Sequence, residues 1–283
     1  MRKDIKEVKG GVMQITTIDE RWYAKPFIDK KTGLPTSYEY FPSVTWITGY
    51  YPKGIGFMKW LASKGWDEAE AIKVAAGDKG SKVHLATEAI ELGKEISIRE
   101  HLPNKTTGNM EELTVEEIDC IVSFRDWLDE VQPETLMTEC CVFGEDYAGT
   151  IDRIYRIDGR IWILDLKTSK SLWPEHTLQI SGYSHAHIDY KKLGITDEEW
   201  KERGLAILQL GYDKFRTPGK PHFKFTEVPD RYDLFRAAYK IWQFEHPGAK
   251  PKTAAYPLVI SSKVRSEALE KKKNKSKSKK QKS

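Results

Sequence analysis

The chain has 283 residues, of which 39% are hydrophobic and 11% aromatic. This composition supplies enough apolar side chains for a buried core, which excludes a largely disordered chain, and the length suits one elaborated domain. No stretch is apolar over the length that spans a bilayer, and the N-terminal MRKDIKEVKGG lacks the apolar segment of a secretory signal. We therefore expect a cytoplasmic protein without a membrane partner.

Charge is distributed unevenly along the chain. The formal net charge is +4, but residues 271–283 hold eight lysines and no acid, so residues 1–270 carry a formal charge near −4. Any nucleic-acid groove on the folded part must then be a local basic patch, assisted by the lysines. We expect one folded domain over residues 1–261, followed by a disordered lysine-rich tail over 262–283.

The three cysteines, Cys120, Cys140 and Cys141, are too few and too unevenly spaced for a disulfide framework or a four-thiolate cluster. Adjacent cysteines on a strand point to opposite faces. We expect all three to act as small apolar side chains.

The first part of the chain is predicted to be β-rich and then helical, an elaboration over about residues 1–80. Thr114-Val-Glu-Glu117 has the pattern of a capping box that opens a helix. The predicted segments are a β-rich region at 11–50 with a hairpin loop at 31–35, helical runs at 55–78 and 81–92 separated by an interruption at 77–80, a polar loop at 100–113, and a helix from 114 through 131.

The centre of the chain changes to the period of β-strands and is predicted to form the core, about residues 81–245. Asp158-Gly159 is a strong hairpin signal. Ile161-Trp-Ile-Leu164 is apolar at every position, which predicts a strand buried on both faces of a sheet between helices. We expect an α/β fold, a mixed central sheet flanked by helices. The predicted segments are strands at 139–143, 148–157, 160–168, 205–212 and 222–228, and helices at 175–193 and 231–244.

Two aspartates and a lysine are the residues most suggestive of chemistry. Asp152 and Asp165 lie on strands joined by a tight hairpin, and Asp165 and Lys167 share one face of their strand. Neighbouring carboxylates repel each other unless a cation lies between them, and such hard ligands favour Mg²⁺ or Mn²⁺. An adjacent ammonium can stabilise charge that develops on a phosphoryl oxygen.

The alternative is that both aspartates cap turns and that Lys167 is a solvated strand end. Against it, Asp165 follows directly after a fully apolar strand, where a charge without a partner is costly. The residues alone leave the two interpretations about equally supported.

A set of motifs in a fixed order adds a resemblance. Gly149-Thr-Ile-Asp152 and Asp165-Leu-Lys167 resemble motifs II and III of the PD-(D/E)XK nuclease superfamily, in its RecB-like and Cas4-like branch, which includes many phage exonucleases. Gly80-Ser-Lys-Val-His84 is similar to the G-x-x-x-H motif of that branch, and Gln179-Ile-Ser-Gly-Tyr183 to its Q-x-x-x-Y motif. Pro42-Ser-Val-Thr45 is similar to the N-terminal region of the phage members. The resemblance covers about residues 40 to 230.

The resemblance implies a restriction-endonuclease-like core with one or two Mg²⁺ or Mn²⁺ ions. The implied ligands are His84, Asp152, Asp165 and the carbonyl of Leu166. Glu88 shares a helical face with His84 and could orient it or contact a second metal position, against the alternative of a solvated glutamate.

Other residues have implied roles around Lys167, which would act in catalysis. Gln179 and Tyr183 would contact Lys167 or a substrate phosphate, or Tyr183 would simply pack the helix on the sheet. Glu139, at the start of its predicted strand, would help order the site. Trp60 would stack on a base or belong to the core.

The expected function is a metal-dependent DNA exonuclease acting in a bacterial or phage-infected cell on DNA that is single-stranded or has free ends. Replication or recombination proteins are possible partners. One departure matters: the iron–sulfur subgroup places three cysteines after the core, and this chain has none after Cys141, so no Fe–S cluster is expected. The alternatives are a structure-specific endonuclease or resolvase on the same fold, a catalytically silent DNA-binding module, and a structural protein with a basic tail.

Overall fold

The computed structural model describes residues 4–8, 11–17, 20–31, 33, 35–212, 222–252 and 254. The chain divides into a compact unit, Met1–Gly248, and a second unit, Ala249–Ser283; the elements below belong to the first. The predicted lysine-rich tail at 262–283 lies outside the described residues. Within the described part of the chain, no helix is long and apolar enough to cross a membrane.

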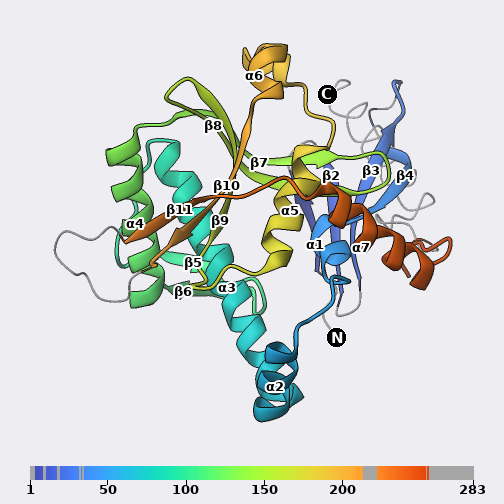
Figure 1. The fold of residues 1–283 in the computed structure, drawn as a ribbon, viewed down its shortest axis with the longest axis horizontal. Helices are drawn as coiled ribbons and strands as arrows, with labels where there is room; N and C mark the ends of the chain where they lie inside the picture. Colours follow the sequence, from blue (N-terminus) through green and yellow to red (C-terminus); the bar gives the residue numbers. More distant parts are fainter. Residues whose placement is uncertain are drawn as a thin grey trace, which may run out of the picture. The chain divides into compact units, whose positions relative to one another are not determined.

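A five-stranded mixed sheet forms the centre of this unit, so the fold is α/β as expected (Figure 1). Strands β9 and β10 are parallel, and the other neighbouring pairs are antiparallel. In spatial order the strands are β11 (Phe223–Glu227), β10 (Gly204–Leu210), β9 (Arg160–Lys167), β8 (Ala148–Ile157) and β7 (Glu134–Phe143).

A separate four-stranded antiparallel sheet precedes it in the chain. Val12, Tyr23 and Phe41 from this sheet pack with Ala148 of β8, which attaches the N-terminal sheet to the central one. The predicted β-rich region began at residue 11, so the first strand was missed. The strands are β1 (Asp4–Val8), β2 (Val12–Thr16), β3 (Arg21–Ile28) and β4 (Pro35–Pro42).

Helices cover both faces of the central sheet (Figure 1). On one face, α3 (Trp66–Glu91) and α4 (Val115–Val131) pack on Leu164 and Leu166 of β9. On the other face, α5 (Pro174–Ser184) packs on β8, β9 and β10. Helices α1 (Val44–Thr48) and α7 (Tyr232–Glu245) pack on α5. Strand β9 is therefore covered on both faces, as its continuous apolar run predicted.

The predicted interruption at 77–80 is wrong. Helix α3 runs unbroken through Gly77 and Gly80, and the break falls at Gly65, between α2 (Ile55–Lys64) and α3. Gly65 has a φ of 75°, a left-handed conformation that glycine adopts without a steric penalty. A glycine inside a helix costs only about 1 kcal/mol relative to alanine, which the alanine-rich flanks of Gly77 offset.

Four further segments differ from expectation. The predicted polar loop at 100–113 contains the hairpin of β5 (His101–Pro103) and β6 (Met110–Glu112). The predicted helix at 175–193 ends at Ser184 and is followed by a short 3₁₀ helix, Tyr190–Leu193. Helix α6 (Asp197–Lys201) leads into β10. Strand β7 begins at Glu134, five residues before the predicted start.

Local chemistry explains the elements that were predicted well. Thr114 and Glu117 form the capping box of α4, each side chain accepting a hydrogen bond from the other residue's backbone N–H. Asp158 and Gly159 both have positive φ, 50° and 78°, as the tight β8–β9 hairpin requires. The three cysteines are free, and Cys120 is buried in the core.

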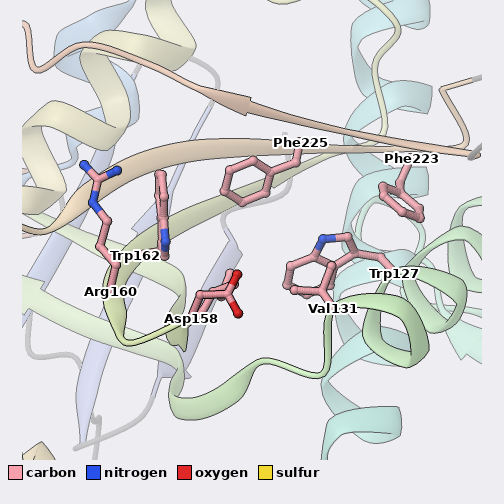
Figure 2. Close-up of a pocket in the computed structure, with 8 residues that line it drawn as sticks. Trp127, Val131, Asp158, Arg160, Trp162, Phe223 and Phe225 are labelled. Carbon is pink, nitrogen blue, oxygen red and sulfur yellow. The ribbon is translucent and has the colours of Figure 1, made fainter.

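An open pocket of about 450 Å³ lies where the sheet extends past the end of α4. Figure 2 shows the rings of Trp127, Trp162, Phe223 and Phe225 around it. The guanidinium of Arg160 lies 4.4 Å from the centre of the Trp162 ring. Because its lining continues the main hydrophobic cluster, the pocket is an incompletely covered part of the core.

Candidate functional site

The site forms where two neighbouring strands separate. The ladder between β8 and β9 runs from Ile157 opposite Arg160 to Arg153 opposite Leu164, and ends there. In the gap beyond it, Oδ2 of Asp152 accepts a hydrogen bond from the backbone N–H of Leu166 at 2.7 Å. Asp152 is thus placed between the strands, close to the backbone of the Asp165–Lys167 segment. The predicted role of the Leu166 carbonyl stays a prediction.

Two further ligand-type side chains reach Asp152 from other elements. Nδ1 of His84, on α3, lies 3.7 Å from Oδ1 of Asp152 and 3.1 Å from Oε1 of Glu139, on β7. One nitrogen or oxygen atom from each of the three residues lies within 4.8 Å of the others. The structure therefore brings His84 and Asp152 together, as the motifs suggested, and adds Glu139 to them.

Glu139 reaches this position because the backbone of β7 is irregular there. It lies in the middle of the strand, not at its start as expected, and its φ is 45°. Side chains alternate between the two faces of a regular strand, and a left-handed residue breaks that alternation. No sequence rule for strands predicts such a residue at a glutamate.

Asp165 and Lys167 lie on the same face of β9 and form an ion pair. Both carboxylate oxygens of Asp165 are buried, and neither accepts a hydrogen bond from any residue in the described ranges. The ammonium of Lys167 is close enough to balance the charge of Asp165, but it is not aligned as a hydrogen-bond donor. Asp165 is not one of the three residues with converging ligand atoms. A 1% exposed carboxylate with no hydrogen-bond donor is an uncommon arrangement.

A chain of hydrogen bonds holds Lys167 from the other side. Its Nζ donates to Oε1 of Gln179 at 3.4 Å, and Nε2 of Gln179 donates to the hydroxyl of Tyr183 at 2.7 Å. The Tyr183 ring packs against Gly149, where a Cβ would lie 2.3 Å from Cε1 of the ring. Gly149, of the Gly149–Asp152 motif, thus leaves the space that the ring of Tyr183, of the Gln179–Tyr183 motif, occupies.

The N-terminal sheet also contributes polar side chains beside the site. Nε2 of Gln14 donates to the hydroxyl of Tyr23 at 2.8 Å, and that hydroxyl lies 3.0 Å from Oγ1 of Thr150. Thr150 shares a face of β8 with Asp152. Gln14 and Tyr23 were not predicted, and the available signal was a glutamine between the apolar residues Met13 and Ile15.

Arg153 is the largest omission. It is completely buried beside Asp152, and its guanidinium contacts Glu91 and Glu139. An arginine between the apolar residues Ile151 and Ile154 of a predicted strand signals a buried charge that needs partners. Sequence spacing could not identify those partners, because Glu91 lies 62 residues away.

The remaining two candidates lie at the edge of the site or outside it. Oε1 of Glu88 accepts a hydrogen bond from Oγ1 of Thr138 at 3.4 Å. Glu139 contacts His84, and the predicted roles of Glu88, orienting His84 or contacting a second metal position, stay predictions. Trp60 is half-buried on α2, a helix with no buried residue, and contacts Phe57 with ring centroids 5.7 Å apart. Trp60 therefore does not belong to the core, and base stacking by it stays a prediction.

Burial and mutual proximity both act on the pKa values of the three converging residues. Burial alone would lower the pKa of His84, but the carboxylates of Asp152 and Glu139 outweigh it and raise this pKa to about 9. Burial raises the pKa of Asp152 to about 7, although His84 acts in the opposite direction. Burial would also raise the pKa of Glu139, but His84 and Arg153 hold it below its ordinary value.

These residues fit a divalent cation. Imidazole nitrogen and carboxylate oxygen are ligands for Mn²⁺, and carboxylates are those preferred by Mg²⁺. A cation would also give the buried Asp165 oxygens a favourable neighbour, which the described side chains do not fully supply. The fit rests on donor chemistry and on this incompletely satisfied carboxylate.

No protein-family model matches the chain, and no curated protein sequence matches it either.

Proposed function

We propose that the protein is a Mg²⁺- or Mn²⁺-dependent DNA nuclease with a restriction-endonuclease-like core. The observation that supports this most is the convergence of His84, Glu139 and Asp152 beside the Asp165–Lys167 pair, at the point where β8 and β9 separate. Buried acids and a lysine at one position fit hydrolysis of a phosphodiester. They fit a DNA-binding module poorly, because clustered acids repel a phosphate when no cation is bound.

In this proposal, four residues bind the cation and Lys167 contacts the substrate phosphate. His84, Glu139, Asp152 and Asp165 would hold the cation. When bound, the cation would supply Lewis-acid chemistry, making a water more acidic and withdrawing charge from the phosphate.

Lys167 would place its ammonium beside the attacked phosphate and stabilise the charge that develops on its oxygens. Its position is fixed by Gln179, which accepts its hydrogen bond and is itself held by Tyr183. This arrangement keeps a flexible lysine near one orientation, which reduces the entropy lost when substrate binds. The ion pair with Asp165 also holds the ammonium on the side of the site where Asp165 lies.

The choice of DNA and the need for a free end come from the motif resemblance. Of the segment between His84 and Asp152, α4 packs in the core, so enclosure of a strand would fall to the β5–β6 hairpin. An enzyme that threads a strand in this way requires an end.

The test is digestion of end-labelled linear single-stranded DNA and of a covalently closed circle of similar length, with and without Mg²⁺ or Mn²⁺. We expect metal-dependent loss of the linear substrate and a stable circle. Equal degradation of both would support an endonuclease instead. Binding of DNA without any metal-dependent cleavage would contradict the nuclease proposal and favour a silent binding module.

A further inference from the structure

Arg153 connects the candidate cation site to the helix behind it. It follows Asp152 on β8 and points to the opposite face of the sheet, towards α3 and α4. Its Nη1 donates to Oε1 of Glu139 at 3.1 Å and to the backbone carbonyl of Asp152 at 2.7 Å, and its Nη2 donates to Oγ1 of Thr87 at 3.2 Å. The guanidinium thus contacts the carboxylate of Glu139 and the backbone of Asp152, which are two candidate cation ligands.

Glu91 supplies the charge that permits this burial. The Nε of Arg153 donates to one oxygen of Glu91, and the hydroxyl of Tyr155 donates to the other at 2.5 Å. Both Arg153 and Glu91 are almost completely buried. A buried ion pair is a poor source of stability compared with apolar packing, so its presence calls for another explanation.

The backbone of Glu139 indicates what that explanation is. A left-handed conformation is unfavourable for a glutamate and persists only when its surroundings impose it. The Glu139 carboxylate contacts Nη1 of Arg153 and Nδ1 of His84. If a cation takes the imidazole of His84, Arg153 becomes the main fixed partner of Glu139 among the contacts described above.

We propose that Arg153 is a positioning residue: anchored on α3 through Glu91 and Thr87, it holds Glu139 in its left-handed conformation and aims the carboxylate at the cation. This inference rests on the proposed cation site. Because Glu91, Thr87 and His84 all belong to α3, the same anchor sets the distance between His84 and Glu139. A rigid, planar guanidinium suits this task, since it forms several hydrogen bonds in fixed directions, whereas a lysine ammonium does not.

The experiment measures Mn²⁺ affinity by electron paramagnetic resonance in the full chain and in Arg153→Lys. This variant keeps the positive charge but loses the planar set of donors that contacts Glu91, Glu139 and Thr87. We expect Mn²⁺ to bind about 10- to 100-fold more weakly, the usual effect of removing a group that orients a ligand. The matched control is Arg156→Lys on the same strand, whose guanidinium pairs with Glu134 at the surface. We expect its affinity to equal that of the wild type.

A double-mutant cycle separates positioning from general structural damage. If Arg153 acts through Glu139, Arg153→Lys should weaken Mn²⁺ binding little further in a Glu139→Gln background. An undiminished effect in that background, or wild-type affinity in folded Arg153→Lys, would overturn the proposal. Should Arg153→Lys fail to fold, Arg153→Met combined with Glu91→Gln removes both buried charges and takes its place in the cycle.

The cycle does not depend on cleavage. A wild-type protein that binds Mn²⁺ and cuts no DNA would contradict the nuclease proposal alone. Unchanged Mn²⁺ affinity in the folded Arg153 variants of a DNA-cutting enzyme would contradict the role of Arg153 alone.

Discussion

The two ends of strand β9 bury different kinds of side chain. At its start, Trp162 lies in an aromatic group with Arg160 against its ring, and the pocket there opens to solvent (Figure 2). Near its end, Asp165 is 1% exposed and has no hydrogen-bond donor among the described residues, although Lys167 is beside it. The apolar end is incompletely covered, whereas the charged end is enclosed.

This difference indicates where function lies. Partial exposure of aromatic rings costs little, and most folded proteins tolerate it. Enclosure of a carboxylate costs far more unless a cation or donors compensate, so it persists where it serves a purpose. The open pocket lies at the aromatic end of β9, whereas the buried carboxylate oxygens without a hydrogen-bond donor among the described residues lie at the Asp165 end.

The largest predicted effect is loss of chemistry at the charged end. Asp165→Ala and Lys167→Ala should each reduce DNA cleavage by about 100- to 1,000-fold or more, because each removes a cation ligand or a stabiliser of developing charge. Turnover at saturating Mg²⁺ and the circular dichroism spectrum are measured together. Near wild-type turnover in either folded variant would show that the active site lies elsewhere.

Sequence reasoning succeeded where short-range chemistry decides the structure. The Thr114–Glu117 capping box, the Asp158–Gly159 turn and the buried strand around Leu164 each follow from a few adjacent residues, and each is confirmed. The alternation of β9 also placed Asp165 and Lys167 on one face.

The sequence did not predict features that depend on contacts between residues far apart in the chain. Glu139 is directed to the site by a left-handed backbone whose partners, His84 and Arg153, come from α3 and β8. The continuity of α3 through Gly77 reflects the summed propensity of a long helix and not the local glycine signal. No spacing rule connects Arg153 with Glu91.

A second prediction concerns pH and the cation. With the pKa of His84 raised to about 9, its imidazole carries a proton at neutral pH, and binding a cation must displace that proton. Mn²⁺ affinity should therefore rise with pH, by about tenfold per unit between pH 7 and 8.5, since one proton is released. Below about pH 7, where Asp152 also gains a proton, the dependence should steepen.

The measurement is Mn²⁺ titration at several pH values. His84→Asn should bind Mn²⁺ more weakly, and its remaining pH dependence should come from Asp152, whose pKa rises further when the charge of His84 is lost. A wild-type affinity that does not change between pH 6 and 8.5 would exclude His84 and Asp152 as ligands.

A third prediction tests the packing that supports Lys167. In Gly149→Ala the new methyl group would lie 2.3 Å from the Tyr183 ring and 3.3 Å from Val44, so the ring must move. We expect a loss of about 1–3 kcal/mol in the free energy of unfolding. Turnover should also fall, because Tyr183 orients Gln179. The matched control is Gly77→Ala, where open space surrounds the new methyl group within a helix, and stability should rise slightly. Unchanged stability and turnover in Gly149→Ala would contradict the proposed support of Lys167.

The smallest effect is expected at the aromatic end of β9. Trp162→Leu removes a half-buried ring that packs edge-on against Phe225 at 5.1 Å, so the free energy of unfolding should fall by about 1–2 kcal/mol. Trp66→Leu is the control, since Trp66 is 71% exposed and its loss should change stability by less than about 0.5 kcal/mol. Mn²⁺ affinity and turnover should stay at wild-type values in both variants, because Leu164 and the residues beyond it separate this end from the charged one. A large loss of turnover in stable Trp162→Leu would show that the aromatic pocket takes part in substrate binding, and the contrast between the two ends of the strand would no longer hold.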